Sequence, residues 1–206
     1  MGRHREFELD VALEAALRAF WKKGYEGTSF DDLTKATGVV RPGLYAAFGN
    51  KEALFLKALD LYDTKYTAFM GTALKQPTAR EVARHVLEGS VNLVTFYPAS
   101  PGCMSVNGAV GCSDSVAGIR DELVKRRNDA QEALKLRFER ARADGDLAAD
   151  ADCAMLAGLL MAVSHGMAVQ AKAGLPRSAL QPIADHVLST WPSAGTLPSP
   201  HRSITS

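Results

Sequence analysis

Cysteines are few in this chain, and they follow no pattern. The 206 residues contain three cysteines, an odd number that argues against a disulfide framework and fits a reducing compartment. The three cysteines and five histidines show neither C-x-x-C nor H-x-x-x-H spacing, so the sequence predicts no metal site. A Gly-rich phosphate loop and a nucleotide motif are absent as well. We therefore expect no cofactor.

Long apolar runs are also missing. Without a run of about 18 apolar residues, no membrane-spanning segment is expected. The first ten residues, MGRHREFELD, hold no apolar h-region, so we expect no secretory signal. These absences predict a cytoplasmic protein.

An excess of positive charge is lacking too. The formal net charge is +1, and residues 1–60 contain nine Lys or Arg against nine Asp or Glu. Bulk charge therefore gives no support to nucleic-acid binding, and any such attraction must come from where individual charges are placed.

The stretch from Thr28 to Phe55 is the most informative segment that is present. Ser29 suits the N-cap of a short helix, and Gly38 can adopt the positive φ that ends one. Pro42 suits the first turn of a second helix, because its missing N–H would be unpaired there in any case. That helix is expected from about residue 41 to residue 48. The segment thus predicts a helix-turn-helix.

The remaining pattern predicts helices throughout. An apolar stripe before Gly24 indicates a first helix, which completes a three-helix domain over residues 1–50. A second helical domain is expected over residues 51–191, and the Pro-, Ser- and Gly-rich residues 192–206 are predicted to form a disordered tail. The helices expected in the second domain cover residues 51–74, 78–96, 115–143, 153–169 and 178–190, with a short segment at 103–111 that could also be helical.

The segment at residues 153–169 reads CAMLAGLLMAVSHGMAV and is apolar nearly all round. A helix of this kind must be covered on most sides. Two interpretations remain: a partner chain covers it, or it is the buried core helix of a monomer.

The first 60 residues carry a specific family signature. The pattern T-x-x-x-x-L-x-x-x-x-G-V-x-x-x-x-L-Y-x-x-F-x-x-K-E-x-L resembles that of TetR/AcrR-type transcriptional repressors. The residues in register are Gly38, Val39, Leu44, Tyr45, Phe48, Lys51, Glu52 and Leu54.

The resemblance implies an all-α fold with an N-terminal three-helix helix-turn-helix DNA-binding domain and a C-terminal helical ligand-binding and dimerisation domain. It also implies a ligand-responsive regulator, a repressor on family grounds, that binds a palindromic double-stranded DNA operator as a homodimer. An unknown small-molecule effector would release it.

By resemblance, the DNA-contacting positions are Thr28 and Ser29 through their backbone N–H groups, together with Arg41, Pro42, Gly43, Tyr45 and Lys51. Arg41 is the strongest candidate for direct readout, because a guanidinium pairs bidentately with guanine at about 1–3 kcal/mol of discrimination. Two positions depart from the family pattern. Val40 stands where relatives often have a small polar residue, and Gly43 offers no side chain at a frequent base-contact position.

Sensing is predicted around the sequence PGCMSVN, which contains Cys103. It resembles a subgroup that includes the N-ethylmaleimide reductase repressor, in which a cysteine in a similar context is implicated in sensing electrophiles. Two interpretations of Cys103 remain open: a reactive sensor thiol, or a small buried apolar residue. Further pocket-lining candidates, chosen by position alone, are Phe96, Met104, Asn107, Phe138 and Met161. For His165, on the apolar segment, three interpretations remain open: it lines a ligand pocket, it lies at a dimer interface, or it is a core residue whose hydrogen bonds are satisfied.

Two other classes of function compete with the regulator. A cysteine-dependent enzyme would use Cys103 as nucleophile, but no His and carboxylate can be paired with it from sequence, so we expect no enzyme. A helical protein-binding adaptor would keep the hairpin as a docking surface. Sequence-selective DNA binding distinguishes the regulator from both.

Overall fold

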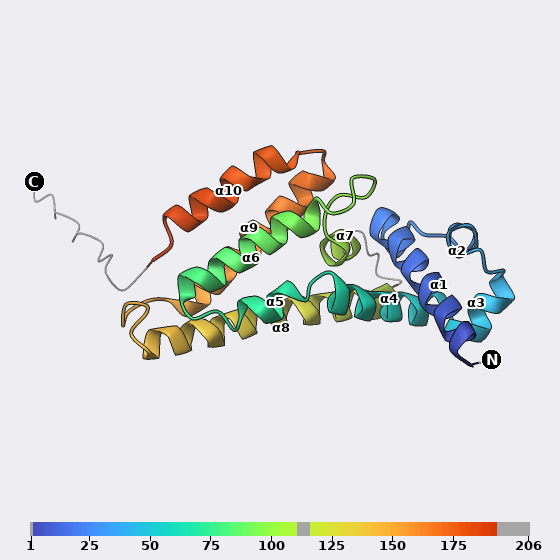
Figure 1. Cartoon of the computed structure of the whole chain (residues 1–206), viewed down its shortest axis with the longest axis horizontal. Coiled ribbons are helices and arrows are strands. Elements are labelled where there is room, and N and C mark those ends of the chain that lie inside the picture. Colours follow the sequence, from blue (N-terminus) through green and yellow to red (C-terminus); the bar gives the residue numbers. More distant parts are fainter. Residues whose placement is uncertain (1, 111–115, 193–206) are drawn as a thin grey trace, which may run out of the picture.

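The structure is a computed structural model that describes residues 2–110 and 116–192. Within these residues it is built of helices and contains no strand, which confirms the predicted all-α class. The elements, shown in Figure 1, are α1 (Gly2–Lys23), α2 (Phe30–Thr37), α3 (Arg41–Phe48), α4 (Lys51–Lys65), α5 (Phe69–Ala73), α6 (Ala79–Val94), α7 (Met104–Val110), α8 (Ala117–Ala143), α9 (Cys153–Lys172) and α10 (Arg177–Ser189).

The helix-turn-helix forms as its local sequence dictates. The Ser29 hydroxyl accepts the Asp32 amide at 3.1 Å, and the Asp32 carboxylate accepts the Ser29 amide at 3.0 Å, so a complete capping box starts α2. Gly38 ends α2 with φ at +70°, in the left-handed region that favours glycine. The predicted bounds of α2 and α3 are confirmed.

One predicted helix is wrong. The segment expected to be continuous over residues 51–74 is broken into α4 and α5. At the break, the Thr67 amide bonds to the Tyr62 carbonyl at 3.2 Å, five residues back. The chain then turns so that the ring of Phe69 lies against Gly89 of α6, where an added Cβ would come within 2.2 Å of a ring carbon. The break is therefore stabilised by the packing of Phe69 in a space that only glycine leaves open.

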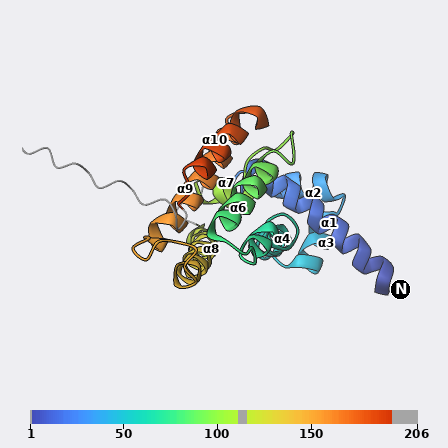
Figure 2. The same ribbon diagram turned by 60° about the vertical axis from the view of Figure 1, so that its left-hand side comes forward.

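Two apolar cores divide the molecule. The first core joins α1 to α4 and also takes in Leu93, Met104, Ile119 and Leu123 from α6, α7 and α8. The second core is built mainly from α6, α8, α9 and α10. Figure 1 places α1, α2 and α3 at one end of an elongated molecule and α10 toward the other, and the turned view in Figure 2 keeps this separation. Because the first core holds side chains of α4, α6, α7 and α8 as well as of α1, α2 and α3, the helix-turn-helix and the rest of the chain share a broad contact.

The apolar helix α9 is longer than predicted and lies in the second core. By length and composition alone it could cross a membrane, but it packs against α6 and α8, and Leu156, Ala157 and Leu160 are buried in the second core. Its other side carries apolar side chains that remain exposed, including Met155 at 54% and Leu159 at 39%. Residues 193–206, most of the predicted tail, lie outside the described residues.

Candidate nucleic-acid interface and ligand cavity

The outer face of α3 presents an ordered arginine. The Arg41 guanidinium lies over the Phe30 ring, 4.3 Å from its centroid, and its Nη2 donates to the Tyr45 hydroxyl at 3.3 Å. The rings of Phe30 and Tyr45 stack at 5.0 Å between centroids. Cation–π contact and hydrogen bonding therefore hold the guanidinium on the exposed side of α3, opposite the buried Leu44 and Phe48.

Neighbouring positions complete this face. Val40, the N-cap of α3, is 72% exposed and its side chain makes no capping hydrogen bond. Pro42 is exposed in the first turn. At Gly43, a position predicted to contact bases, an added Cβ would lie 2.8 Å from the Cγ1 of Val39, so a side chain there would need Val39 to move.

The other predicted DNA contacts lie at the edges of the face. Lys51 is half-buried at the start of α4, with its Nζ 4.5 Å above the Tyr25 ring, and burial lowers its pKa. Thr28 is buried and its hydroxyl donates to the Gly24 carbonyl at 2.6 Å. The amides of Thr28 and Ser29 bond to the Tyr25 carbonyl and to the Asp32 carboxylate. These two amides are thus occupied inside the chain, where they position α2.

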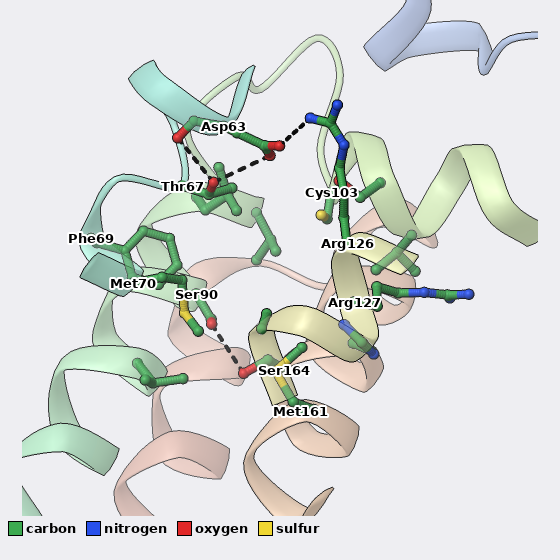
Figure 3. Close-up of a pocket in the computed structure, with 17 residues that line it drawn as sticks. Asp63, Thr67, Phe69, Met70, Ser90, Cys103, Arg126, Arg127, Met161 and Ser164 are labelled. Carbon is green, nitrogen blue, oxygen red and sulfur yellow. Dashed lines mark hydrogen bonds and ion pairs between the residues drawn. The ribbon is translucent and has the colours of Figure 1, made fainter. Parts of the chain in front are cut away.

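A cavity of about 130 Å³ lies between the turn that joins α4 to α5 and helices α6, α7, α8 and α9. Its walls are mainly apolar and include Phe69, which is labelled in Figure 3, together with Val86, Leu93 and Val106. Three predicted sensing residues come together in its lining: Cys103, Met161 and His165.

The other predicted sensing residues do not line this cavity. Phe96 is 56% exposed and packs edge-on against Tyr97 in the loop after α6. Met104 is buried in the first core, and Phe138 packs against Trp191 in the second. Asn107 lies beside Gly102 and faces a different depression, next to Lys22 and Lys172. Sequence position along a helix did not reveal which side each residue would take.

Polar groups at the cavity wall were not predicted. The Ser90 hydroxyl donates to the Ser164 hydroxyl at 3.0 Å across the cavity wall (Figure 3). Arg126 bonds to Asp60, Asp63 and Glu122. Burial alone would lower the pKa of Arg126, but these three carboxylates raise it, so its charge is already neutralised within the protein.

His165 is the cavity's titratable side chain on α9. Burial, and then the positive charge of Arg127, lower the pKa of His165 from 6.5. The imidazole is therefore neutral at physiological pH. Within residues 2–110 and 116–192, no group of three or more His, Cys, Asp and Glu side chains could hold a metal ion.

Cys103 is half-buried at the cavity wall and has a specific partner. The hydroxyl of Tyr62, on α4, donates to its Sγ at 3.1 Å. Burial and the neighbouring Cys103 raise the pKa of Tyr62 well above its usual value, so this hydroxyl remains a donor. One residue earlier, the carbonyl of Gly102 accepts the indole N–H of Trp21, on α1, at 2.9 Å. Neither aromatic residue was among the predicted site residues.

Two family models match the chain. One is described as bacterial regulatory proteins, tetR family, and matches residues 12–58, which include the helix-turn-helix. The other is described as tetracyclin repressor-like, C-terminal domain, and matches residues 81–187. Together they span both cores.

A curated relative matches along nearly the whole chain. The HTH-type transcriptional repressor ComR of Escherichia coli (strain K12) is 31% identical over 193 residues, which cover 93% of this chain and 92% of that protein.

Solved structures share the fold. A cysteine mutant of the TetR family transcriptional regulator CifR, complexed with 26-bp double-strand operator DNA, has a TM-score of 0.83 and 38% identity, covering 89% of this chain and 96% of that one. The reduced form of E. coli NemR has a TM-score of 0.72 at 19% identity, covering 92% of this chain and 100% of that one, a likeness of fold alone.

Proposed function

Because the chain belongs to the TetR family of bacterial regulatory proteins, we propose that it is a cytoplasmic transcriptional repressor that binds a palindromic operator as a homodimer. The observation that carries this proposal is the exposed Arg41 on α3, braced by Phe30 and Tyr45. The recognition helix of a helix-turn-helix enters the major groove with its N-terminal residues against the bases. Arg41 stands at that end of α3.

The interface reads bases from the start of α3 and contacts the backbone at its margins. Arg41 pairs with guanine, with Val40 and Pro42 beside it. Tyr45 and Lys51 lie farther along and contact phosphates. Thr28 and Ser29 hold α2 in place. Because the chain has almost no net charge, its affinity for nonspecific DNA is weak.

Dimerisation supplies the second reading helix. Met155, Leu159 and Val169 are exposed along one side of α9, and Ile183 is exposed on α10. An exposed apolar surface of this kind marks a protein interface. The two helices pair with their two-fold mates as a four-helix interface, which presents two copies of α3 to successive major grooves about 34 Å apart.

The cavity beside Cys103 receives the effector. Its apolar walls suit a small apolar molecule, and the thiol at its wall suits an electrophile. In that reaction a bond forms from sulfur to the electrophilic carbon, the displaced electron pair moves to the leaving group or the conjugated carbonyl, and the thiol proton passes to water. The effector releases DNA because it binds more tightly to a dimer whose recognition helices are wrongly spaced for the operator. The size of the effect is set by the difference in the effector's affinity for the two dimer geometries.

The same site argues against a cysteine hydrolase. Such an enzyme needs a base within hydrogen-bond reach of its nucleophile. The hydrogen-bond partner of Sγ is instead the hydroxyl of Tyr62, whose raised pKa makes it a donor. We therefore assign the chain to regulation and not to cysteine-dependent hydrolysis.

Selection of bound DNA from random sequence tests the central proposal. We expect a palindrome whose half-sites are about one helical turn apart, protected from nuclease by the dimer. Compounds are then screened for release of that DNA. Failure to enrich any sequence would overturn the proposal and leave the adaptor in its place.

A further inference from the structure

Three consecutive residues between α6 and the start of α7 are held by side chains from the DNA-reading end of the molecule. Trp21 of α1 donates to the Gly102 carbonyl at 2.9 Å. Tyr62 of α4 donates to the Sγ of Cys103 at 3.1 Å and accepts the Met104 amide at 3.3 Å. Residues 102–104, which we call the clamped turn, are therefore bonded to two different reading-end helices.

The two side chains that hold the clamped turn are fully buried, and we call this pair the clamp. Neither Trp21 nor Tyr62 has any exposed surface, and their rings meet edge to face with 4.8 Å between centroids. Gly102 is buried too, with φ at +98°, a conformation that few other residues adopt. A close-packed interior transmits a displacement to its neighbours instead of absorbing it.

The clamped turn also borders the cavity, because Cys103 contributes to the cavity wall. Its sulfur thus has the cavity on one side and the Tyr62 hydroxyl on another. A group attached to Sγ, or a molecule pressed against it, must displace the sulfur from this position. The buried hydroxyl and carbonyl then lose partners unless α4 and α1 move with the turn, and buried groups without partners are strongly disfavoured.

We propose that Trp21 and Tyr62 are positioning residues that transmit the state of Cys103 to α1 and α4, and so to the spacing of the recognition helices. This inference rests on the proposed sensing role of Cys103 and adds the contacts through which the signal passes. Helix α1 packs on α2, and α4 follows α3 directly, so both α1 and α4 bear on the helix-turn-helix.

Iodoacetamide provides a defined probe. The Cys103 sulfur bonds to its methylene carbon, the carbon–iodine bond breaks, iodide leaves with the bonding pair, and the thiol proton passes to water. The background protein carries Cys112→Ser and Cys153→Ala, so that one alkyl group per chain, counted by mass spectrometry, reports on Cys103. For each variant, operator affinity is compared before and after complete alkylation.

Two tyrosines on either side of the α4 terminus give a matched pair. Tyr62→Phe keeps the ring and removes the hydroxyl that holds the clamped turn. Tyr66→Phe removes a hydroxyl that bonds to Glu14 and Tyr97 instead. We expect alkylation to weaken operator binding about tenfold or more in the background and in Tyr66→Phe, but less than about threefold in Tyr62→Phe.

Fluorescence of Trp21 gives a second measurement that needs no DNA. In a Trp191→Phe background, alkylation should shift the indole emission as its N–H leaves the Gly102 carbonyl, and Tyr62→Phe should reduce that shift. If alkylation weakens operator binding equally in Tyr62→Phe and in the background, Tyr62 does not transmit the state of Cys103, and the proposal is overturned. An emission shift that depends on Tyr62, without any loss of operator affinity, would support the coupling of Cys103 to Trp21 through Tyr62 and overturn the sensing role of Cys103. If alkylation changes neither the emission nor the operator affinity, both the coupling and the sensing role are overturned.

Discussion

The guanidinium of Arg41 rests on the ring of Phe30, with 4.3 Å between its central carbon and the ring centroid. The two residues belong to different helices, so the contact ties the recognition helix α3 to the start of α2. An arginine held in this way has already lost part of its rotamer freedom before DNA arrives. Less conformational entropy is then lost on binding, which favours affinity for a site that matches its geometry.

Replacing Arg41 with lysine tests whether it reads a base. Lysine keeps the charge but loses the planar fork that pairs with guanine. We expect Arg41→Lys to weaken operator binding about tenfold and nonspecific binding less than about twofold. Fluorescence anisotropy at one fixed salt concentration measures both, with Arg140→Lys on the exposed face of α8 as control. Equal losses on both DNAs would show that Arg41 only neutralises phosphate.

The exposed side chain of Val40 leads to a second, independent prediction about the operator sequence. Serine or threonine would cap α3 more favourably by about 1 kcal/mol, yet an exposed valine stands there. We expect its methyl groups to pack on the C5-methyl of a thymine beside the guanine read by Arg41. Replacing that thymine with uracil should then weaken wild-type binding about fourfold, the value of one buried methyl group. Val40→Ser should bind both DNAs alike, and an undiminished preference for thymine in that variant would assign the contact elsewhere.

The exposed side of α9 predicts the behaviour of the dimer. A glutamate at Leu159 places a charge in the centre of the proposed interface, where it would be buried without a partner. We expect Leu159→Glu to sediment as a folded monomer and to lose operator binding. Leu136→Glu alters a leucine on α8 that is 55% exposed, against 39% for Leu159, and it serves as the control that should remain a dimer. A dimeric Leu159→Glu would move the interface away from α9.

Local chemistry explains which parts of the fold were predictable. Ser29 and Asp32 are three residues apart and cap the same helix, so the start of α2 follows from a short segment. Gly38 marks its end in the same way. The break after α4 could not be predicted from a short segment. It depends on Gly89, in α6, which leaves room for the ring of Phe69, in α5.

The candidate sites likewise contain some residues with a local sequence signal and others without one. Arg41 was recognisable from the family pattern, and Cys103 from the Pro-Gly turn before it. Tyr62 and Trp21 looked like ordinary core residues, since their polar atoms find partners 41 and 81 residues away. The role proposed for them depends on tertiary contacts, for which a single sequence carries no local signal.

Titration of His165 predicts how stability depends on pH. Burial and the charge of Arg127 lower its pKa in the folded state from 6.5, so below that pH the unfolded chain binds the proton more readily. The stability associated with the neutral imidazole is therefore present above about pH 6.5 and is lost as the pH falls through and below it. Between about pH 7.5 and pH 5.5, we expect Tm to fall further for the wild type than for His165→Gln, measured by calorimetry. His186→Gln, which alters an exposed histidine on α10, should follow the wild type. Parallel curves for the wild type and His165→Gln would mean that His165 takes up its proton in the folded chain as easily as in the unfolded one.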